Sequence, residues 1–302
     1  MDGILNIYKE KGFTSHDVVA KLRKILHQKR IGHTGTLDPE AEGVLPVCIG
    51  KATKLCGLLT EKEKCYRTTA VLGIKTDTQD TSGQVLAKTD TAGITESQIL
   101  ETILSFVGSY GQIPPMYSAK KVDGKKLYEY ARQGIEVERE PVQVTILSIE
   151  NIDIDMQEYT FSMDVTCSKG TYIRTLCHDI GEKLGCGAAM QSLLRTRVKD
   201  FTIQNALTLK EVEELVQEDN LAPRMFSVTD MFPEYKRVHV LEEYHTYPAN
   251  GNPVKISCLQ EPVPQLSQGE KVWLYDHTGC LIGIYVLQGK GLLKPATMFF
   301  IQ

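Results

Sequence analysis

Helical and strand-like hydrophobic patterns alternate along the first 220 residues. Several segments carry apolar residues every three or four positions, and a hydroxyl residue precedes some of them as a candidate N-cap. This pattern predicts helices at Ser15–Leu26, Ala52–Leu59, Thr95–Phe106, Leu127–Gln133, Thr171–Leu184 and Leu209–Glu218. Shorter alternating or wholly apolar runs predict strands at Ile4–Tyr8, Val44–Ile49, Lys64–Ile74, Val142–Ile154 and Tyr159–Ser168. The last two strands are close enough in sequence to pair.

The chain changes character after about residue 220. Seven of its 12 prolines lie beyond that point. Two strand-like runs, Lys271–Tyr275 and Leu281–Val286, flank the polar turn Asp276–Gly279. We therefore expect two domains: a larger one over residues 1–232 and a small all-β one over residues 233–302, with the boundary near Pro233.

Composition narrows the class of protein. The chain has 302 residues, of which 42% are hydrophobic and 24% charged, as is ordinary for a soluble globular protein. No apolar run approaches the ~18 residues of a membrane span. The start, Met1-Asp2-Gly3-Ile4, has neither a basic region nor a long apolar one, so we expect no secretory signal and a cytoplasmic location. The eight cysteines form no C-x-x-C pair, and we expect them to be reduced and mostly buried.

The net charge of −4 gives no overall attraction to nucleic acid. Basic residues nevertheless gather in three places: Lys21–Arg30, Lys120–Lys126, and the alternating Arg195, Arg197 and Lys199. Each alone is more typical of a solvated face. Three such clusters on an acidic chain favour a nucleic-acid partner without establishing one.

The segment Gly32–Gly43 is rich in glycine and hydroxyl residues, which allow a backbone to approach a ligand closely. Within it, Asp38 precedes Pro39 and is biased to an extended conformation that presents its carboxylate from a loop. A turn residue or a helix cap is the alternative interpretation of Asp38. Neither a Walker phosphate loop nor the dinucleotide-binding G-x-G-x-x-G pattern is present in this segment.

Gly32–Pro39, followed by Glu42–Pro46, resembles the signature loop of the bacterial TruB-type tRNA pseudouridine synthases. The likeness covers nearly the whole chain. Six further segments resemble other motifs of the family in the same order: Lys9 with Gly12–His16, Lys64–Arg67, Gly73–Gly83, Ile113–Lys120, Gly124–Tyr128 and Ser168–Thr175. Two residues depart from the pattern: Glu10 stands where the family usually has proline, and Leu194 where it often has arginine. These departures put details of RNA contact in doubt.

The resemblance implies a fold and a set of site residues. The fold is α+β, with a central mixed, mainly antiparallel sheet flanked by helices, an active cleft across the sheet, an RNA-contacting insertion at about residues 112–140, and a small C-terminal β-barrel module similar to PUA domains. The implied catalytic residues are Asp38 as nucleophile, Tyr66 stacking on the target base, and Arg174 pairing with Asp38. The implied substrate-binding residues are His33, Lys54, Tyr172 and Leu193.

These residue types suit the reaction, in which the N1–C1′ bond of uridine breaks, the uracil turns and C5 bonds to the sugar. No redox or phosphoryl step occurs, so we expect neither a cofactor nor a metal. A closed pocket raises the pKa of an aspartate, and a cation within ~4–6 Å lowers it by ~1–3 units. Tyr66 offers stacking worth ~1–3 kcal/mol and a hydroxyl that can accept the C5 proton. Whether Asp38 attacks C6, attacks C1′ or assists a glycal route stays open.

Residue type alone is also compatible with roles outside catalysis: packing for Tyr66, a structural role for His33 and a surface ion pair for Arg174.

We expect an enzyme that converts the uridine at position 55, in the T loop of tRNA, with the T arm as its partner. We also expect a monomer that does not bind membranes. Two alternatives remain. One is a synthase of the same chemistry on another RNA, and the other is a non-catalytic tRNA-binding or tRNA-folding protein.

Overall fold

A computed structural model describes residues 1–299 of the chain. Its centre is a nine-stranded sheet with the order β1-β3-β12-β4-β11-β10-β7, in which β2 pairs with β3 and β13 with β12. All neighbouring strands are antiparallel except β12 and β3, which are parallel. The strands are β1 Gly3–Lys9, β2 Ile31–His33, β3 Glu42–Ile49, β4 Lys64–Leu72, β7 Gly108–Gln112, β10 Val142–Asp155, β11 Thr160–Cys167, β12 Ala188–Val198 and β13 Phe201–Thr202. The expected mixed, mainly antiparallel sheet is confirmed.

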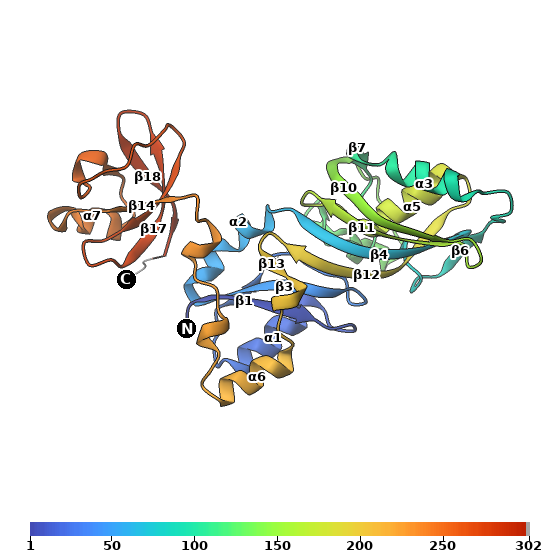
Figure 1. Ribbon diagram of the computed structural model, residues 1–302, viewed down its shortest axis with the longest axis horizontal. Coiled ribbons are helices and arrows are strands. Elements are labelled where there is room, and N and C mark those ends of the chain that lie inside the picture. The colour runs from blue at the N-terminus through green and yellow to red at the C-terminus, as the bar shows by residue number, and fades with distance from the viewer. Residues whose placement is uncertain (300–302) are drawn as a thin grey trace.

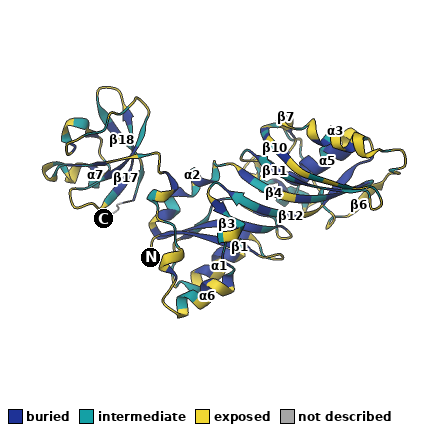
Figure 2. Cartoon of the chain, viewed as in Figure 1, coloured by how far each residue is buried: buried dark blue, intermediate teal, exposed yellow. Residues whose placement is uncertain are grey.

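Two pairs of helices cover the two halves of this sheet (Figure 1). Helices α1 (Ser15–Ile25) and α6 (Leu209–Gln217) pack on the half that contains β1 and β3. Helices α3 (Glu96–Leu104) and α5 (Ile173–Leu184) pack on the half that contains β4, β11 and β10. Helices α1, α3 and α6 are exposed on their outer faces, whereas α5 is mostly buried (Figure 2). Each half therefore has its own apolar core, and the parallel β3–β12 contact joins them.

The N-terminal ends of three helices follow from capping. Thr14, Thr95 and Thr208 each accept a hydrogen bond from the backbone N–H three residues later, and the side chain of that later residue accepts one from the cap's own N–H. Helix α5 ends at Gly185, whose φ of 79° is cheap only for glycine.

Two expectations need correction. The segment Ala52–Leu59 is not one helix: a 3₁₀ turn, Gly50–Leu55, leads into the short α2, Cys56–Thr60. The Thr53 hydroxyl donates to the Gly50 carbonyl at 2.7 Å in that turn. The central strand β12 was not expected at all. Two register shifts, after Met190 and after Arg195, break its alternation of buried and exposed residues, so it lacks the period that marks a strand.

The C-terminal module is a curled five-stranded sheet with the order β14-β16-β17-β18-β15, as expected of a PUA-like barrel. Its strands are β14 Lys236–His239, β15 Val254–Lys255, β16 Lys271–Tyr275, β17 Leu281–Gln288 and β18 Leu292–Met298, and a single-turn helix, α7, spans Thr246–Ala249. The module has its own core, centred on Val272, Leu274 and Tyr285.

An aromatic cluster joins this module to the rest of the chain. Phe232 stacks on Tyr235 with ring centroids 5.0 Å apart, and the buried Trp273 donates from Nε1 to the Phe232 carbonyl at 3.1 Å. The ammonium of Lys199 lies over the Phe232 ring, 4.9 Å from its centroid. The same apolar cluster includes Ile4 of strand β1. Residues on both sides of Pro233 thus share one core.

Two smaller hairpins project from the main sheet. Strands β5 (Ile74–Thr76) and β6 (Val85–Lys88) form one. Strands β8 (Lys121–Val122) and β9 (Lys125–Lys126) form the other, and helix α4 (Leu127–Ala131) follows it directly within the connection from β7 to β10.

All eight cysteines are free thiols, but only half of them are fully buried. Within residues 1–299, no helix is long and apolar enough to cross a membrane.

Candidate active site

The loop between β2 and β3 carries Asp38, and two anchors fix it. The Ser15 hydroxyl, at the start of α1, accepts a hydrogen bond from the Leu37 N–H at 2.9 Å. On the other side, the ammonium of Lys9, which is 0% exposed, donates to the carbonyls of Pro39 and Ala41. Burial lowers the pKa of Lys9 to about 8. The loop is therefore held from α1 and from β1 at once.

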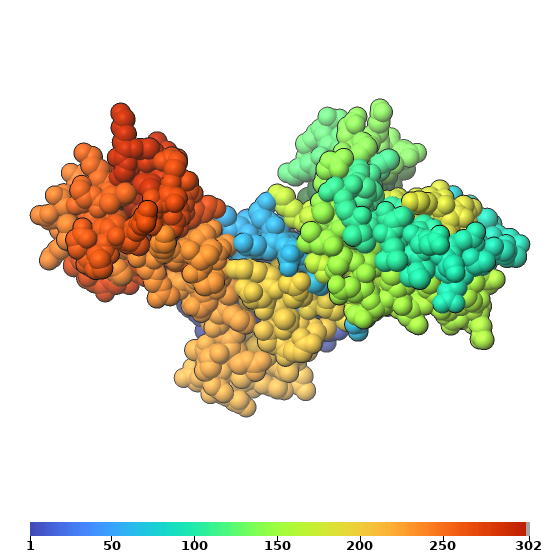
Figure 3. Space-filling model, turned by 45° about the horizontal axis from the view of Figure 1, so that its top comes forward, coloured from blue at the N-terminus to red at the C-terminus, as the bar shows by residue number. Residues whose placement is uncertain are grey.

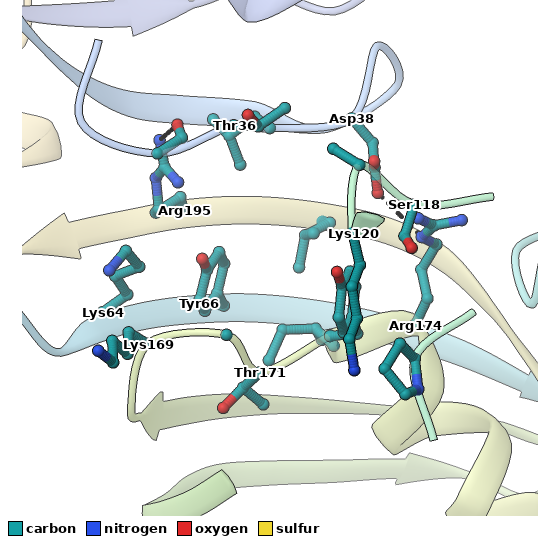
Figure 4. Close-up of a pocket in the computed structure, with 18 of the residues that line it drawn as sticks. Thr36, Asp38, Lys64, Tyr66, Ser118, Lys120, Lys169, Thr171, Arg174 and Arg195 are labelled. Carbon is teal, nitrogen blue, oxygen red and sulfur yellow. Dashed lines mark hydrogen bonds and ion pairs between the residues drawn. The ribbon is translucent and has the colours of Figure 1, made fainter. Parts of the chain in front are cut away.

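Arg174 binds Asp38 from the first turn of α5. Its Nε lies 2.9 Å from Asp38 Oδ2 (Figure 4). Its other nitrogens donate to the Thr78 and Tyr117 carbonyls at 2.9 Å each, and Nη1 lies 3.6 Å from Asp80 Oδ2. One guanidinium thus joins the Asp38 loop, the β5–β6 hairpin and the segment before β8. Burial raises the pKa of Asp38, and the nearby Arg174 opposes that rise.

A cavity of about 500 Å³ opens beside this ion pair. Tyr66 lies on its floor, on β4, and is 7% exposed (Figure 4). Leu193 lines it from the neighbouring strand β12, opposite Thr68. Tyr172 lines it from the residue before α5. The structure therefore brings five of the residues singled out in the sequence, counting Asp38 and Arg174, to one cavity.

His33 and Lys54 lie off the lining of this cavity. His33 ends strand β2, where its Nδ1 accepts a hydrogen bond from the Gly35 N–H at 3.3 Å and its ring meets that of His16 edge-on. Burial lowers the pKa of His33, which favours the neutral ring. Lys54 lies on the 3₁₀ turn, where partial burial and then Arg30 lower its pKa. Both residues are close in sequence to the site but face other surroundings.

The alternating cluster Arg195, Arg197 and Lys199 is not a solvated face, and this expectation was wrong. Arg195 is 1% exposed, with Nε donating to the Val44 carbonyl at 2.6 Å and Nη2 to the Gly35 carbonyl at 3.2 Å. Arg197 pairs with Glu63, and Lys199 covers Phe232. Because β12 has a bulge at this point, three alternating residues reach three different places.

Sequence reasoning also missed Lys64 as a site residue. It is 7% exposed, lines the cavity and donates to the Thr60 and Lys62 carbonyls at 2.9 and 2.7 Å. Burial and then Arg195 lower the pKa of Lys64 to about 8. Lys64 stands two residues before Tyr66 on β4, so strand alternation alone places both on one face. Arg195 reaches the site only through the register of β12 against β4, which a local pattern does not give.

The surface is hollowed between the C-terminal module and the green segment that connects β7 and β10 (Figure 3). Lys120 from that segment and the exposed Lys169 both line the cavity. A large ligand can therefore rest across the sheet while one group enters the cavity.

Comparisons with known proteins agree on one family. A model described as "TruB family pseudouridylate synthase (N terminal domain)" matches residues 23–173, and one described as "tRNA pseudouridylate synthase B C-terminal domain" matches residues 174–229. A protein named tRNA pseudouridine synthase B from Lachnoclostridium phytofermentans is 48% identical over 99% of this chain and 100% of its own. One of the same name from Alkaliphilus oremlandii is 49% identical over 88% of each chain.

Solved structures share the fold at low sequence identity. A chain in the crystal structure of a Cbf5–Nop10–Gar1 complex matches with a TM-score of 0.72 and 23% identity, over 98% of this chain and 84% of its own. A chain in an H/ACA ribonucleoprotein bound to a substrate RNA containing 2′-deoxyuridine matches with a TM-score of 0.70 and 22% identity, over 99% and 85%.

Proposed function

The chain belongs to the TruB family of pseudouridylate synthases, and from that membership we propose that it isomerises uridine to pseudouridine at position 55, in the T loop of tRNA. Such an enzyme is an isomerase: it cleaves the N1–C1′ bond, turns the uracil and rejoins it through C5. The Asp38–Arg174 ion pair at the edge of a cavity that Tyr66 and Leu193 line is the observation that carries the proposal.

Asp38 is the nucleophile in this proposal, and Arg174 keeps it ionised. A guanidinium stays charged when buried, and Arg174 is only 5% exposed. Its two backbone acceptors, the Thr78 and Tyr117 carbonyls, hold it in place before substrate arrives. The carboxylate is thus presented in a fixed direction, which favours a reaction that depends on the position of one oxygen.

The cavity walls hold the loose base. Tyr66 stacks on the uracil, Leu193 closes the apolar side and Tyr172 lines the side next to Arg174. The target nucleotide must leave its stack to enter, at a cost of a few kcal/mol. His33, kept neutral at the edge of the Asp38 loop, supports the flipped conformation, and Lys54 supports the RNA nearby. Once inside, the base can turn while the walls exclude water.

The rest of the tRNA lies outside the cavity in this proposal. The T arm occupies the hollow between the C-terminal module and the segment of residues about 112–140, where Lys120–Lys126 grip phosphates. Residues 1–232 form the catalytic domain, and residues 233–302 add an RNA-binding domain. We further propose that the enzyme acts as a cytoplasmic monomer.

The decisive test is release of tritium from a tRNA transcript that carries [5-³H]uridine. The wild type, without metal or nucleotide, is expected to release about one tritium per tRNA, because only the target C5–H bond breaks. Asp38→Asn is expected to release none while still binding tRNA. Asp153→Asn is the matched control, since Asp153 is an exposed aspartate on β10.

Mapping the pseudouridine in the product tests the position. Pseudouridine outside the T loop would contradict position 55 and favour another RNA target. Tight tRNA binding without tritium release by the wild type would overturn the enzyme proposal for this substrate.

A further inference from the structure

The two ends of the active-site cavity differ in charge balance. At one end, Arg174 faces two carboxylates, Asp38 at 2.9 Å and Asp80 at 3.6 Å. At the other end, Lys64 and Arg195 line the wall around Tyr66 (Figure 4). Within residues 1–299, neither of these two cations has a carboxylate within 4 Å. The hydrogen bonds that they donate go to backbone carbonyls.

The strand register fixes this positive end relative to Tyr66. Arg195 on β12 stands directly opposite Tyr66 on β4 in the antiparallel ladder. Directly opposite residues have their Cβ atoms ~4.5–5.5 Å apart on the same face. Burial raises the pKa of Tyr66, and the nearby Arg195 guanidinium opposes that rise. Lys64, two residues before Tyr66 on β4, points to the same face.

Burying a cation without a counter-ion is costly. Removing the ion from water costs hydration free energy, and carbonyl acceptors offset only part of that cost. Arg195 is 1% exposed and Lys64 is 7% exposed, so water solvates neither of them well. A site that carries this cost becomes more favourable when an anion forms beside it.

We propose that Lys64 and Arg195 form an anion-stabilising subsite for the uracil base at the moment when it is detached from the sugar. This inference rests on the proposed pseudouridine synthesis. In the route in which Asp38 attacks C1′, a carboxylate oxygen bonds to C1′ and the N1–C1′ electron pair leaves with the base as an anion. C5 of that anion then bonds to C1′ with the ring's electron pair, and the C1′–O bond breaks so that the negative charge returns to the Asp38 carboxylate. C5 finally gives a proton to solvent and N1 gains one.

The negative charge on the base spreads over N1, O2 and O4, so the stabilising group must lie along the ring rather than at one atom. The positive end surrounds the residue on which the ring stacks. Preorganised charges that meet an anion only in the transition state lower the barrier without tightening substrate binding. The subsite therefore acts on the chemical step.

A backbone phosphate is the other anion that the substrate brings. It lies on the outside of a flipped nucleotide, towards the cavity mouth, where Lys169 is 54% exposed. Lys64 and Arg195 are almost fully enclosed by the wall instead. Their burial favours the base over the phosphate as the anion that they meet.

Single-turnover rates and tRNA affinities of four variants test the inference. Arg195→Met and Lys64→Met are expected to slow pseudouridine formation by ~10²-fold, as the loss of one oxyanion donor does, with a Kd for tRNA within about threefold of the wild type. Arg195→Lys is expected to restore part of the rate. Arg67→Met is the control. Arg67 is 60% exposed and pairs with Asp164 of the neighbouring strand β11, on the face of the sheet opposite to Tyr66.

Lys64→Met separates charge from loop structure. Arg195 also holds the Gly35 carbonyl near the Asp38 loop, whereas the hydrogen bonds of Lys64 go to Thr60 and Lys62. If Arg195→Met does not fold, Lys64→Met and Arg195→Lys decide the question. Unchanged rates and affinities in both variants would show that there is no such subsite. An unchanged rate with weaker tRNA binding and a shallower salt dependence would instead identify a phosphate contact. A wild type without activity would overturn the proposed function itself.

Discussion

Replacing Arg174 with methionine is expected to raise the pKa of Asp38 and shift the pH dependence of the reaction. At the 2.9 Å separation of Nε and Oδ2, two unit charges attract by roughly 6 kcal/mol at an effective dielectric constant of about 20. That value is an upper bound, because the Asp38 side chain is 40% exposed and Asp80 shares the same guanidinium. We therefore expect a shift of ~1–3 pKa units, which is usual for an aspartate beside an arginine.

The sign of the shift determines the assay. The proposed nucleophile is the ionised carboxylate, so the single-turnover rate rises with pH as Asp38 loses its proton. Burial already raises the pKa of Asp38, and losing the cation raises it further, so the acid limb of the rate profile moves to higher pH by ~1–3 units. Arg174→Lys keeps the charge, so its limb stays near that of the wild type while its plateau falls, because one ammonium cannot also hold the Thr78 and Tyr117 carbonyls. An Arg174→Met limb at the wild-type position would refute the reasoning.

Three further predictions concern packing and burial. Gly43→Ala is expected to lower the unfolding free energy measured in urea by more than ~2 kcal/mol, because φ at Gly43 is +103° and the new Cβ would lie 2.2 Å from the Arg195 carbonyl oxygen. The control Gly12→Ala, at φ +85° with open space around it, should lower it by about 1 kcal/mol. Equal losses in the two variants would contradict the clash. Leu193→Ala is expected to cost about 2 kcal/mol in the same assay and to slow catalysis by admitting water, whereas full activity would remove Leu193 from the cavity's function. Buried Lys9, with its pKa of about 8, binds its proton less tightly in the folded than in the unfolded chain, so its contribution to the unfolding free energy rises by up to ~3 kcal/mol between pH 8 and about 10.4. The Lys9→Met variant should lack that rise. Identical curves of unfolding free energy against pH for the two proteins would exclude this contribution of Lys9.

Helices α1, α3 and α6 could be predicted from sequence because their signals are local. Thr14, Thr95 and Thr208 each begin a capping box, and the helices start where those boxes do. Strand β12 could not be predicted in the same way. Its two bulges interrupt the alternation, and its buried residues include an arginine, which a local pattern assigns to the surface. What makes it a strand is pairing with β4, more than 100 residues earlier in the chain.

The residues of the candidate site also fall into those that the sequence predicts and those that depend on strand pairing. The resemblance to a family singled out Asp38, Tyr66 and Arg174, and the structure places all three at one cavity. It assigned no site role to Lys64, although Lys64 lies in the same motif as Tyr66, or to Arg195. Their closeness depends on the β4–β12 register, and charged residues are almost never fully buried, so composition pointed the other way.

The junction between the two sheets contains the chain's only tryptophan, and this makes it an optical reporter. Trp273 is 1% exposed, its ring packs at tilted angles against Phe232, Tyr235 and Phe299, and its indole N–H donates to the Phe232 carbonyl. Its emission therefore reports a single event, the wetting of that junction. A red shift during denaturation marks separation of the C-terminal module, and its timing relative to the loss of far-ultraviolet circular dichroism tells whether the two sheets melt together. An emission maximum that stays fixed when tRNA is added would show that the junction stays closed to water.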